Sequence, residues 1–97
     1  MKALRDPERA ELSHLVNVCE LTDQFVLEIG CGDGKFIRQY SSLPKRVVGL
    51  DVELSDLCTA HKMKPVPTDQ PFYLQANGEK LPFPENSFDI VIFASSL

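Results

Sequence analysis

Short apolar runs recur along the chain at the length of buried strands. The first, Phe25-Val26-Leu27-Glu28-Ile29, is mostly apolar and ends in glycines, as expected of a strand buried on both faces. Three further runs, at 47–51, 72–76 and 88–93, predict three more strands.

Between these runs, apolar residues recur at helical spacing. Phe36, Ile37, Tyr40 and Leu43 mark the inner face of a helix that Pro44 stops, and a second helix begins near Leu54. An earlier helix starts at Asp6-Pro7-Glu8 and carries an apolar stripe over residues 12–19. Because strands alternate with helices, we expect one α/β domain over 1–97, with a doubly wound, Rossmann-like parallel sheet and flanking helices.

Charge and cysteine content narrow the class of protein. The formal charge of -4 speaks against nucleic acid or an anionic membrane as the main partner, because both would be repelled on average. Apolar runs fall far short of the ~20 residues that span a bilayer. The three cysteines are an odd number at wide spacing, which fits neither a disulfide framework nor a zinc pair. We therefore expect a reduced, cytoplasmic protein without a bound metal.

The most informative stretch is 28–34, Glu-Ile-Gly-Cys-Gly-Asp-Gly, where the first strand turns into a helix. Glycines there let the backbone approach a ligand closely, and open α/β sheets bind ligands beyond the carboxyl ends of their strands. A tight turn without a ligand is the alternative interpretation. A dinucleotide fingerprint, G-x-G-x-x-G, would need glycine where Lys35 stands, so the spacing disfavours NAD.

From Val26 to Gly34 the chain resembles the first motif of class I S-adenosylmethionine (SAM)-dependent methyltransferases, an acidic residue followed by G-x-G-x-G. The resemblance implies that the loop approaches the methionine part of SAM, through Gly30, Cys31, Gly32 and Gly34. It also implies that Glu28 faces the ammonium group of SAM, directly or through water, where opposite charges favour binding. The Cys31 side chain is expected to pack as a small residue inside the loop.

An acidic residue closes the second predicted strand. Asp51 at this strand end can accept hydrogen bonds from both ribose hydroxyls, and capping of the next helix is its alternative role. By the resemblance, Val52 packs on the adenine ring.

Residues 75–89 resemble the G-D-A-E-x-L-P-F-x-x-x-S-F-D signature of the ubiquinone/menaquinone-biosynthesis-like branch, often called methyltransferase type 11. This implies that Asn77 takes the place of an Asp that accepts from the adenine amino group, and that the Gly78 amide donates to a ring nitrogen. The amide oxygen of Asn77 can still accept, but loss of the charge weakens the contact by roughly 1 kcal/mol.

The resemblance covers about half of the family's domain. The family sheet has the strand order 3-2-1-4-5-7-6, and this chain supplies 3-2-1-4, so it is expected to be the SAM-binding half, truncated after strand four. The apolar strand at 90–93 would then keep an unpaired edge. We expect this edge to be covered by a second copy in a homo-oligomer, by a partner chain, or by residues missing from this chain.

Three functions remain open at this point. The first is a SAM-dependent methyltransferase acting on an unidentified, small-molecule acceptor; no catalytic residue is assigned, because positioning and exclusion of water can carry methyl transfer. The second is a non-catalytic SAM-binding or interaction module. The third, a nucleotide-cofactor oxidoreductase, is disfavoured by the glycine spacing.

Overall fold

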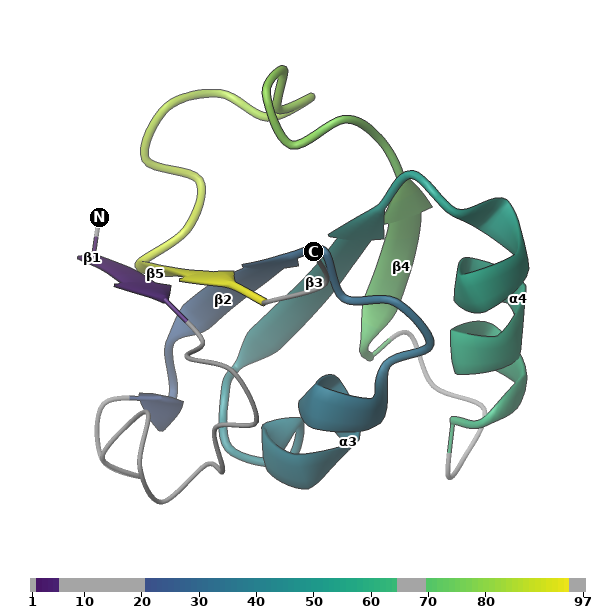
Figure 1. Cartoon of the computed structure of the whole chain (residues 1–97). Helices are drawn as coiled ribbons and strands as arrows, with labels where there is room; N and C mark the ends of the chain where they lie inside the picture. The colour runs from purple at the N-terminus through teal and green to yellow at the C-terminus, as the bar shows by residue number, and fades with distance from the viewer. Residues whose placement is uncertain (1, 6–20, 65–69, 95–97) are drawn as a thin grey trace.

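The computed structural model describes residues 2–5, 21–64 and 70–94. They form one parallel sheet of five strands in the order β1-β5-β2-β3-β4 (Figure 1). The strands are β1 (Lys2–Arg5), β2 (Phe25–Ile29), β3 (Arg46–Asp51), β4 (Phe72–Gln75) and β5 (Ile90–Phe93). Helix α3 (Lys35–Tyr40) follows β2, and helix α4 (Leu54–Lys62) follows β3. In the described part of the chain, no helix has the length and apolar character needed to cross a membrane.

The predicted Rossmann-like parallel sheet is confirmed. Its predicted order, 3-2-1-4, is present as β4-β3-β2-β5. Strand β2 has the predicted bounds, and helix α3 ends at Tyr40 instead of reaching Leu43, whose amide donates to the Tyr40 carbonyl in a turn. The predicted helix from Asp6, with its apolar stripe, lies outside the described residues.

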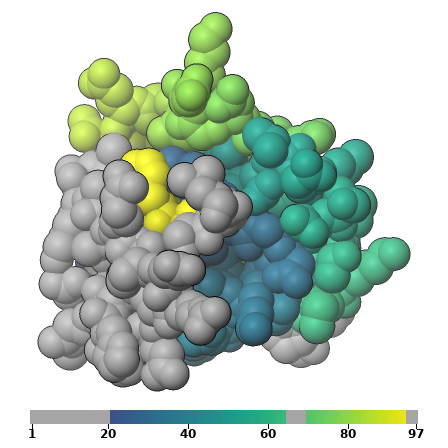
Figure 2. Space-filling model, in the orientation of Figure 1, coloured from purple at the N-terminus to yellow at the C-terminus, as the bar shows by residue number. Residues whose placement is uncertain are grey.

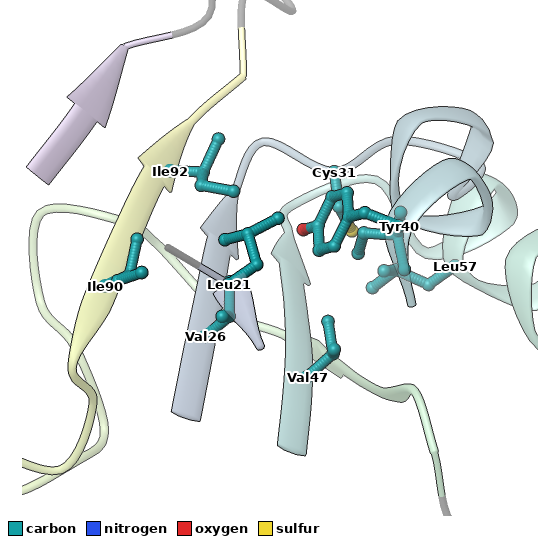
Figure 3. Packing of buried hydrophobic residues seen from close by; sticks show 9 residues of the cluster. Leu21, Val26, Cys31, Tyr40, Val47, Leu57, Ile90 and Ile92 are labelled. Atoms are coloured by element: carbon teal, nitrogen blue, oxygen red, sulfur yellow. The ribbon is translucent and has the colours of Figure 1, made fainter. Parts of the chain in front are cut away.

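Alternation along the strands divides the core between the two faces of the sheet. One face packs against both described helices through side chains such as Tyr40 of α3 and Leu57 of α4 (Figure 3). On the other face, Leu27, Leu50 and their neighbours pack against Phe83 and Phe88. The second face is thus covered here by the connection between β4 and β5 rather than by a described helix.

The expectation of an unpaired edge on β5 is wrong. Strand β1 lies along that edge in parallel register, from Lys2 opposite Ile90 to Arg5 opposite Phe93. The chain's own strand β1 therefore provides the backbone pairing along this edge. We had expected that pairing from a second copy, a partner chain or missing residues. The sequence reading failed here because it placed no strand before residue 25.

The connection between β4 and β5 carries the third predicted motif and rises beyond one end of the sheet (Figures 1 and 2). Two phenylalanines anchor it, with the rings of Phe83 and Phe88 packed edge to face at 5.0 Å. Asp89 then fixes the start of β5 to the start of β2: its Oδ2 accepts from the Phe25 amide at 2.9 Å, and its own amide donates to the Phe25 carbonyl at 2.8 Å. The motif thus has a structural role in setting where β5 enters the sheet.

Candidate functional site

A cavity lies where the carboxyl ends of four strands meet. Its volume is about 400 Å³, and it is lined by Ile29, Gly30, Leu50, Asp51, Val52, Ala76, Asn77, Gly78, Glu79 and Phe93. Five of these were predicted as site residues: Gly30, Asp51, Val52, Asn77 and Gly78. The structure thus brings the first strand's glycine, the second strand's acid and the third strand's turn to one place, as parallel strands require of their carboxyl ends.

The glycine loop adopts a backbone that other residues rarely tolerate. Gly30, Gly32 and Gly34 have φ angles of 78°, 55° and 81°, all in the left-handed region. The amides of Gly30 and Cys31 both donate to the Leu50 carbonyl, at 2.7 and 3.1 Å, which fixes the loop to β3.

Gly32 and Gly34 differ in their surroundings. A Cβ at Gly32 would meet nothing within 4 Å, whereas one at Gly34 would lie 2.6 Å from the Tyr73 hydroxyl. The space next to the Gly32 backbone is therefore open, whereas Gly34 is needed because the Tyr73 side chain packs closely against the loop there.

Asp51 joins the loop to the next helix. Its Oδ2 accepts from the Gly32 amide at 2.8 Å, and its Oδ1 accepts from the Glu53 amide at 2.9 Å. The carboxylate lines the cavity and is 8% exposed. Each oxygen keeps a further lone pair, so Asp51 can still accept hydrogen bonds from two ligand hydroxyls.

The third strand contributes a tight turn to the cavity. Asn77 Oδ1 accepts from the Glu79 amide at 2.8 Å, which holds the turn closed. At Gly78 a Cβ would lie 2.7 Å from the Cγ2 atom of Ile29, so only glycine fits there without displacing the cavity wall. Val52 forms another part of the wall and is 59% exposed, which leaves its apolar surface available to a flat ligand ring.

Glu28 lies away from the cavity lining. Its side chain is 0% exposed, and Oε1 accepts from the Tyr40 hydroxyl at 2.8 Å. It therefore belongs to the face of the sheet that α3 covers, and its predicted contact with an ammonium group stays a prediction.

Comparisons with known proteins identify the family. Residues 27–97 match the sequence profile of the methyltransferase domain family. The chain belongs to this family. A comparison with curated proteins finds no significant match.

Solved structures similar to this methyltransferase domain include SAM-dependent enzymes. A SAM-dependent methyltransferase from Mesorhizobium loti is 31% identical with a TM-score of 0.69, over 76% of this chain and 34% of that one. One from Methanosarcina mazei is 26% identical with a TM-score of 0.58, over 71% and 35%. A Haloferax volcanii complex that includes a methyltransferase activator matches at 25% identity and a TM-score of 0.66, over 75% and 32%. The chain spans about a third of the length of these structures.

In this methyltransferase domain, Cys31 is a packed thiol. It is 6% exposed, and its Sγ would lie 2.9 Å from a Cβ built on Gly49. Burial, and then the charges of Glu28 and Asp51, raise the pKa of the thiol to about 12. The thiol therefore stays protonated at neutral pH, as expected of a small packing residue and not of a nucleophile.

Sequence reasoning missed half of the cavity wall of the methyltransferase domain, namely Ile29, Leu50, Ala76, Glu79 and Phe93. Four of these are apolar residues within or next to the last residue of a predicted strand. Their signal was available, because every strand of a parallel sheet ends at the same edge. Phe93 lines the cavity from the last position of β5. It was missed because only the unpaired side of this strand was considered, and not the residue at its carboxyl end.

Proposed function

We propose that this chain binds SAM in the cavity at the ends of β2, β3, β4 and β5, as the cofactor-binding part of a methyltransferase that acts on a small molecule. The hydrogen bond from the Gly32 amide to Asp51 Oδ2 carries the proposal. This bond links the glycine loop to the acid of the neighbouring strand, which supports a common cradle formed by the two.

The residues present fit such a ligand. A volume of about 400 Å³ lies within the range of roughly 300–1,000 Å³ typical of small-molecule sites. Leu50, Val52 and Phe93 offer apolar surface for a purine ring, and Asp51 offers two acceptors for ribose hydroxyls. The open space at Gly32 lets ligand atoms approach the loop backbone.

The same geometry disfavours a dinucleotide. A pyrophosphate needs free amides at the start of the helix after β2, but the Lys35 amide donates to Asp33 Oδ1 at 3.1 Å. The carboxylate of Asp33, a residue of the loop, and that of Asp51, which is hydrogen-bonded to the loop, would also repel phosphate. The oxidoreductase alternative thus loses support from the structure as well as from the glycine spacing.

When bound, SAM supplies a methyl group on a positively charged sulfur, which is electrophilic without further activation. The chain's own contribution would be binding and orientation: Asp51 would hold the ribose, and the apolar wall would hold the adenine. Asn77 and Gly78 are proposed to recognise the adenine edge through the Asn77 amide oxygen and the Gly78 amide. We assign no general base.

The proposal is tested by calorimetric titration with SAM, S-adenosylhomocysteine and NAD side by side. We expect binding of the first two, no binding of NAD, and loss of binding in Asp51→Ala. Asp56→Ala, which removes a carboxylate from α4 outside the cavity lining, is the matched control. Tight NAD binding, or unchanged SAM binding in Asp51→Ala, would refute the assignment.

Three finer expectations stay proposals. A non-catalytic SAM-binding module would share the binding step, and only a methyl-transfer assay with SAM and candidate acceptors separates the two. A partner chain is compatible with the family, since a Haloferax volcanii match is a complex that includes an activator. The cytoplasmic location still rests on the cysteine pattern of the sequence.

A further inference from the structure

Glu28 occupies an unusual place for a carboxylate. In the sheet it lies between Gly49 of β3 and Ile92 of β5, and its side chain is fully buried on the face that α3 covers. Two residues later the chain enters the glycine loop at Gly30. Burying a carboxylate is costly unless hydrogen bonds stabilise it, so the groups around Glu28 determine whether it can keep its charge there.

Tyr40 is the hydrogen-bond donor that the fold brings to this carboxylate. Its hydroxyl lies 2.8 Å from Glu28 Oε1, and its side chain is 0% exposed. Figure 3 shows the ring beside Cys31 with the hydroxyl directed toward the sheet. Packed edge to face against Phe36 at 5.4 Å, the ring has little freedom to turn the hydroxyl away.

Burial, and then the charge of Glu28, raise the pKa of Tyr40 well above its ordinary value of 10.0. The hydroxyl therefore keeps its proton at all physiological pH values and acts only as a donor toward the carboxylate.

The charge of Glu28 affects Cys31, a residue of the glycine loop. After burial, the charges of Glu28 and then Asp51 are the largest causes that raise the pKa of the Cys31 thiol, and Glu28 lies opposite Gly49, the residue that packs against the Cys31 sulfur. Asp51 borders the cavity, whereas Glu28 lies beneath the loop. Gly49 makes this arrangement possible, because a Cβ there would lie within 2.9 Å of the Cys31 sulfur.

We propose that Tyr40 is a positioning residue for ligand binding: its hydroxyl holds the Glu28 carboxylate beneath the glycine loop, where the negative charge attracts the cationic amino end of SAM. The inference rests on the proposed function and adds a residue to it. Tyr40 acts through Glu28 and touches no ligand. Loss of the Tyr40 hydroxyl therefore weakens the binding of ligands that carry the amino group and leaves the binding of ligands without this group unchanged.

The test compares two ligands in Tyr40→Phe, a change that keeps the buried ring and removes only the hydroxyl. S-adenosylhomocysteine carries the amino-acid end, and methylthioadenosine keeps the adenosine and the sulfur but lacks that end. We expect the Kd of S-adenosylhomocysteine to rise about tenfold and that of methylthioadenosine to change less than about twofold. Tyr73→Phe, which removes the other hydroxyl near the loop, is the matched control and should alter the two affinities equally.

A double-mutant cycle with Glu28→Gln shows whether Tyr40 acts through the charge. Glu28→Gln should also weaken binding of S-adenosylhomocysteine and leave binding of methylthioadenosine nearly unchanged. Adding Tyr40→Phe to Glu28→Gln should change neither affinity further. The double variant buries no charge, so it tolerates the missing hydroxyl better. If Tyr40→Phe alone does not fold, comparison of the double variant with Glu28→Gln decides the question.

The outcomes separate this inference from the proposed function. If the unmodified chain binds neither ligand, the proposed function fails. Suppose that the unmodified chain binds both ligands. If Tyr40→Phe then leaves the ratio of the two affinities unchanged, or weakens both equally, the role of Tyr40 is refuted while the proposed function stands. A further selective loss in the double variant would also refute it, because the effect would then not pass through Glu28.

Discussion

Gly34 offers a sharp test of the packing beneath the glycine loop. Its φ of +81° is strained for any residue with a Cβ, and that Cβ would lie 2.6 Å from the Tyr73 hydroxyl oxygen. Two further contacts, to Ala60 Cβ and Arg38 Nη1, would each be 3.2 Å. Gly34→Ala therefore combines backbone strain with overpacking.

The two costs can be separated by comparison with Gly32→Ala. Gly32 also has a positive φ, +55°, but a Cβ there meets nothing within 4 Å, so only strain of about 1–2 kcal/mol applies. At Gly34 the overpacking adds about 1–3 kcal/mol, mostly from the hydroxyl of Tyr73. We thus expect Gly34→Ala to lower the free energy of unfolding by about 2–5 kcal/mol and Gly32→Ala by about 1–2 kcal/mol.

Urea unfolding followed by circular dichroism measures both effects. With a slope of about 1–2 kcal/mol per M for a small domain, Gly34→Ala should lower the midpoint by at least about 1 M. Tyr73→Phe removes the clashing oxygen, so the Gly34→Ala/Tyr73→Phe double variant should regain about 1 kcal/mol or more relative to additivity. If the double variant is additive, or if Gly32→Ala is as destabilising as Gly34→Ala, the clash does not determine the cost.

Four further predictions concern the site, the sheet and the buried thiol. Asn77→Asp should keep or tighten SAM binding, because a carboxylate also accepts from the Glu79 amide and adds charge; clear weakening by calorimetry would count against the adenine assignment. Removal of residues 1–5 exposes the outer edge of β5, and light scattering should then show self-association; a monomer as soluble as the full chain would contradict the β1 pairing. The buried Cys31 thiol, with its pKa raised to about 12, should resist alkylation at pH 8 while exposed Cys58 reacts, as mapped by mass spectrometry. Cys31 labelling as fast as Cys58 would refute this protection. Because the folded chain retains the Cys31 proton, the free energy of unfolding should also fall as pH rises from the ordinary pKa of 9.0 toward 12, and urea unfolding that shows no fall over this range would contradict the raised pKa.

The sequence predicted the elements whose signals are local. The run Phe25–Ile29 is apolar and ends at glycines, so both its bounds and its burial could be read directly. Strand β1 could not be found in this way, because four residues, Lys2–Arg5, carry too short a pattern and pair only with a strand some 88 positions away in register. Such a pairing depends on the whole sheet and leaves no local trace.

Tyr40 shows a signal that was present and not used. The helical spacing placed it on the inner face with Phe36 and Ile37, and both Ile37 and Tyr40 are buried in α3. A buried tyrosine nearly always needs a partner for its hydroxyl. The acid in the preceding strand, Glu28, was the natural partner, but it had been assigned to a ligand by family resemblance.

Position along the strands separates the two predicted acids: Glu28 lies opposite Gly49, and Asp51 follows two residues later at the end of β3. Successive side chains of a strand point to opposite faces, so Glu28 shares a face with Val26, and Ile29 shares the other with Leu27. Ile29 lines the cavity, whereas Glu28 is fully buried on the face that α3 covers. Asp51, at the last position of β3, instead turns its carboxylate toward the loop and the cavity. The glycine loop thus has one carboxylate hydrogen-bonded to it and a second, buried carboxylate two residues before it, and this concentration of negative charge favours a cationic ligand over a phosphate.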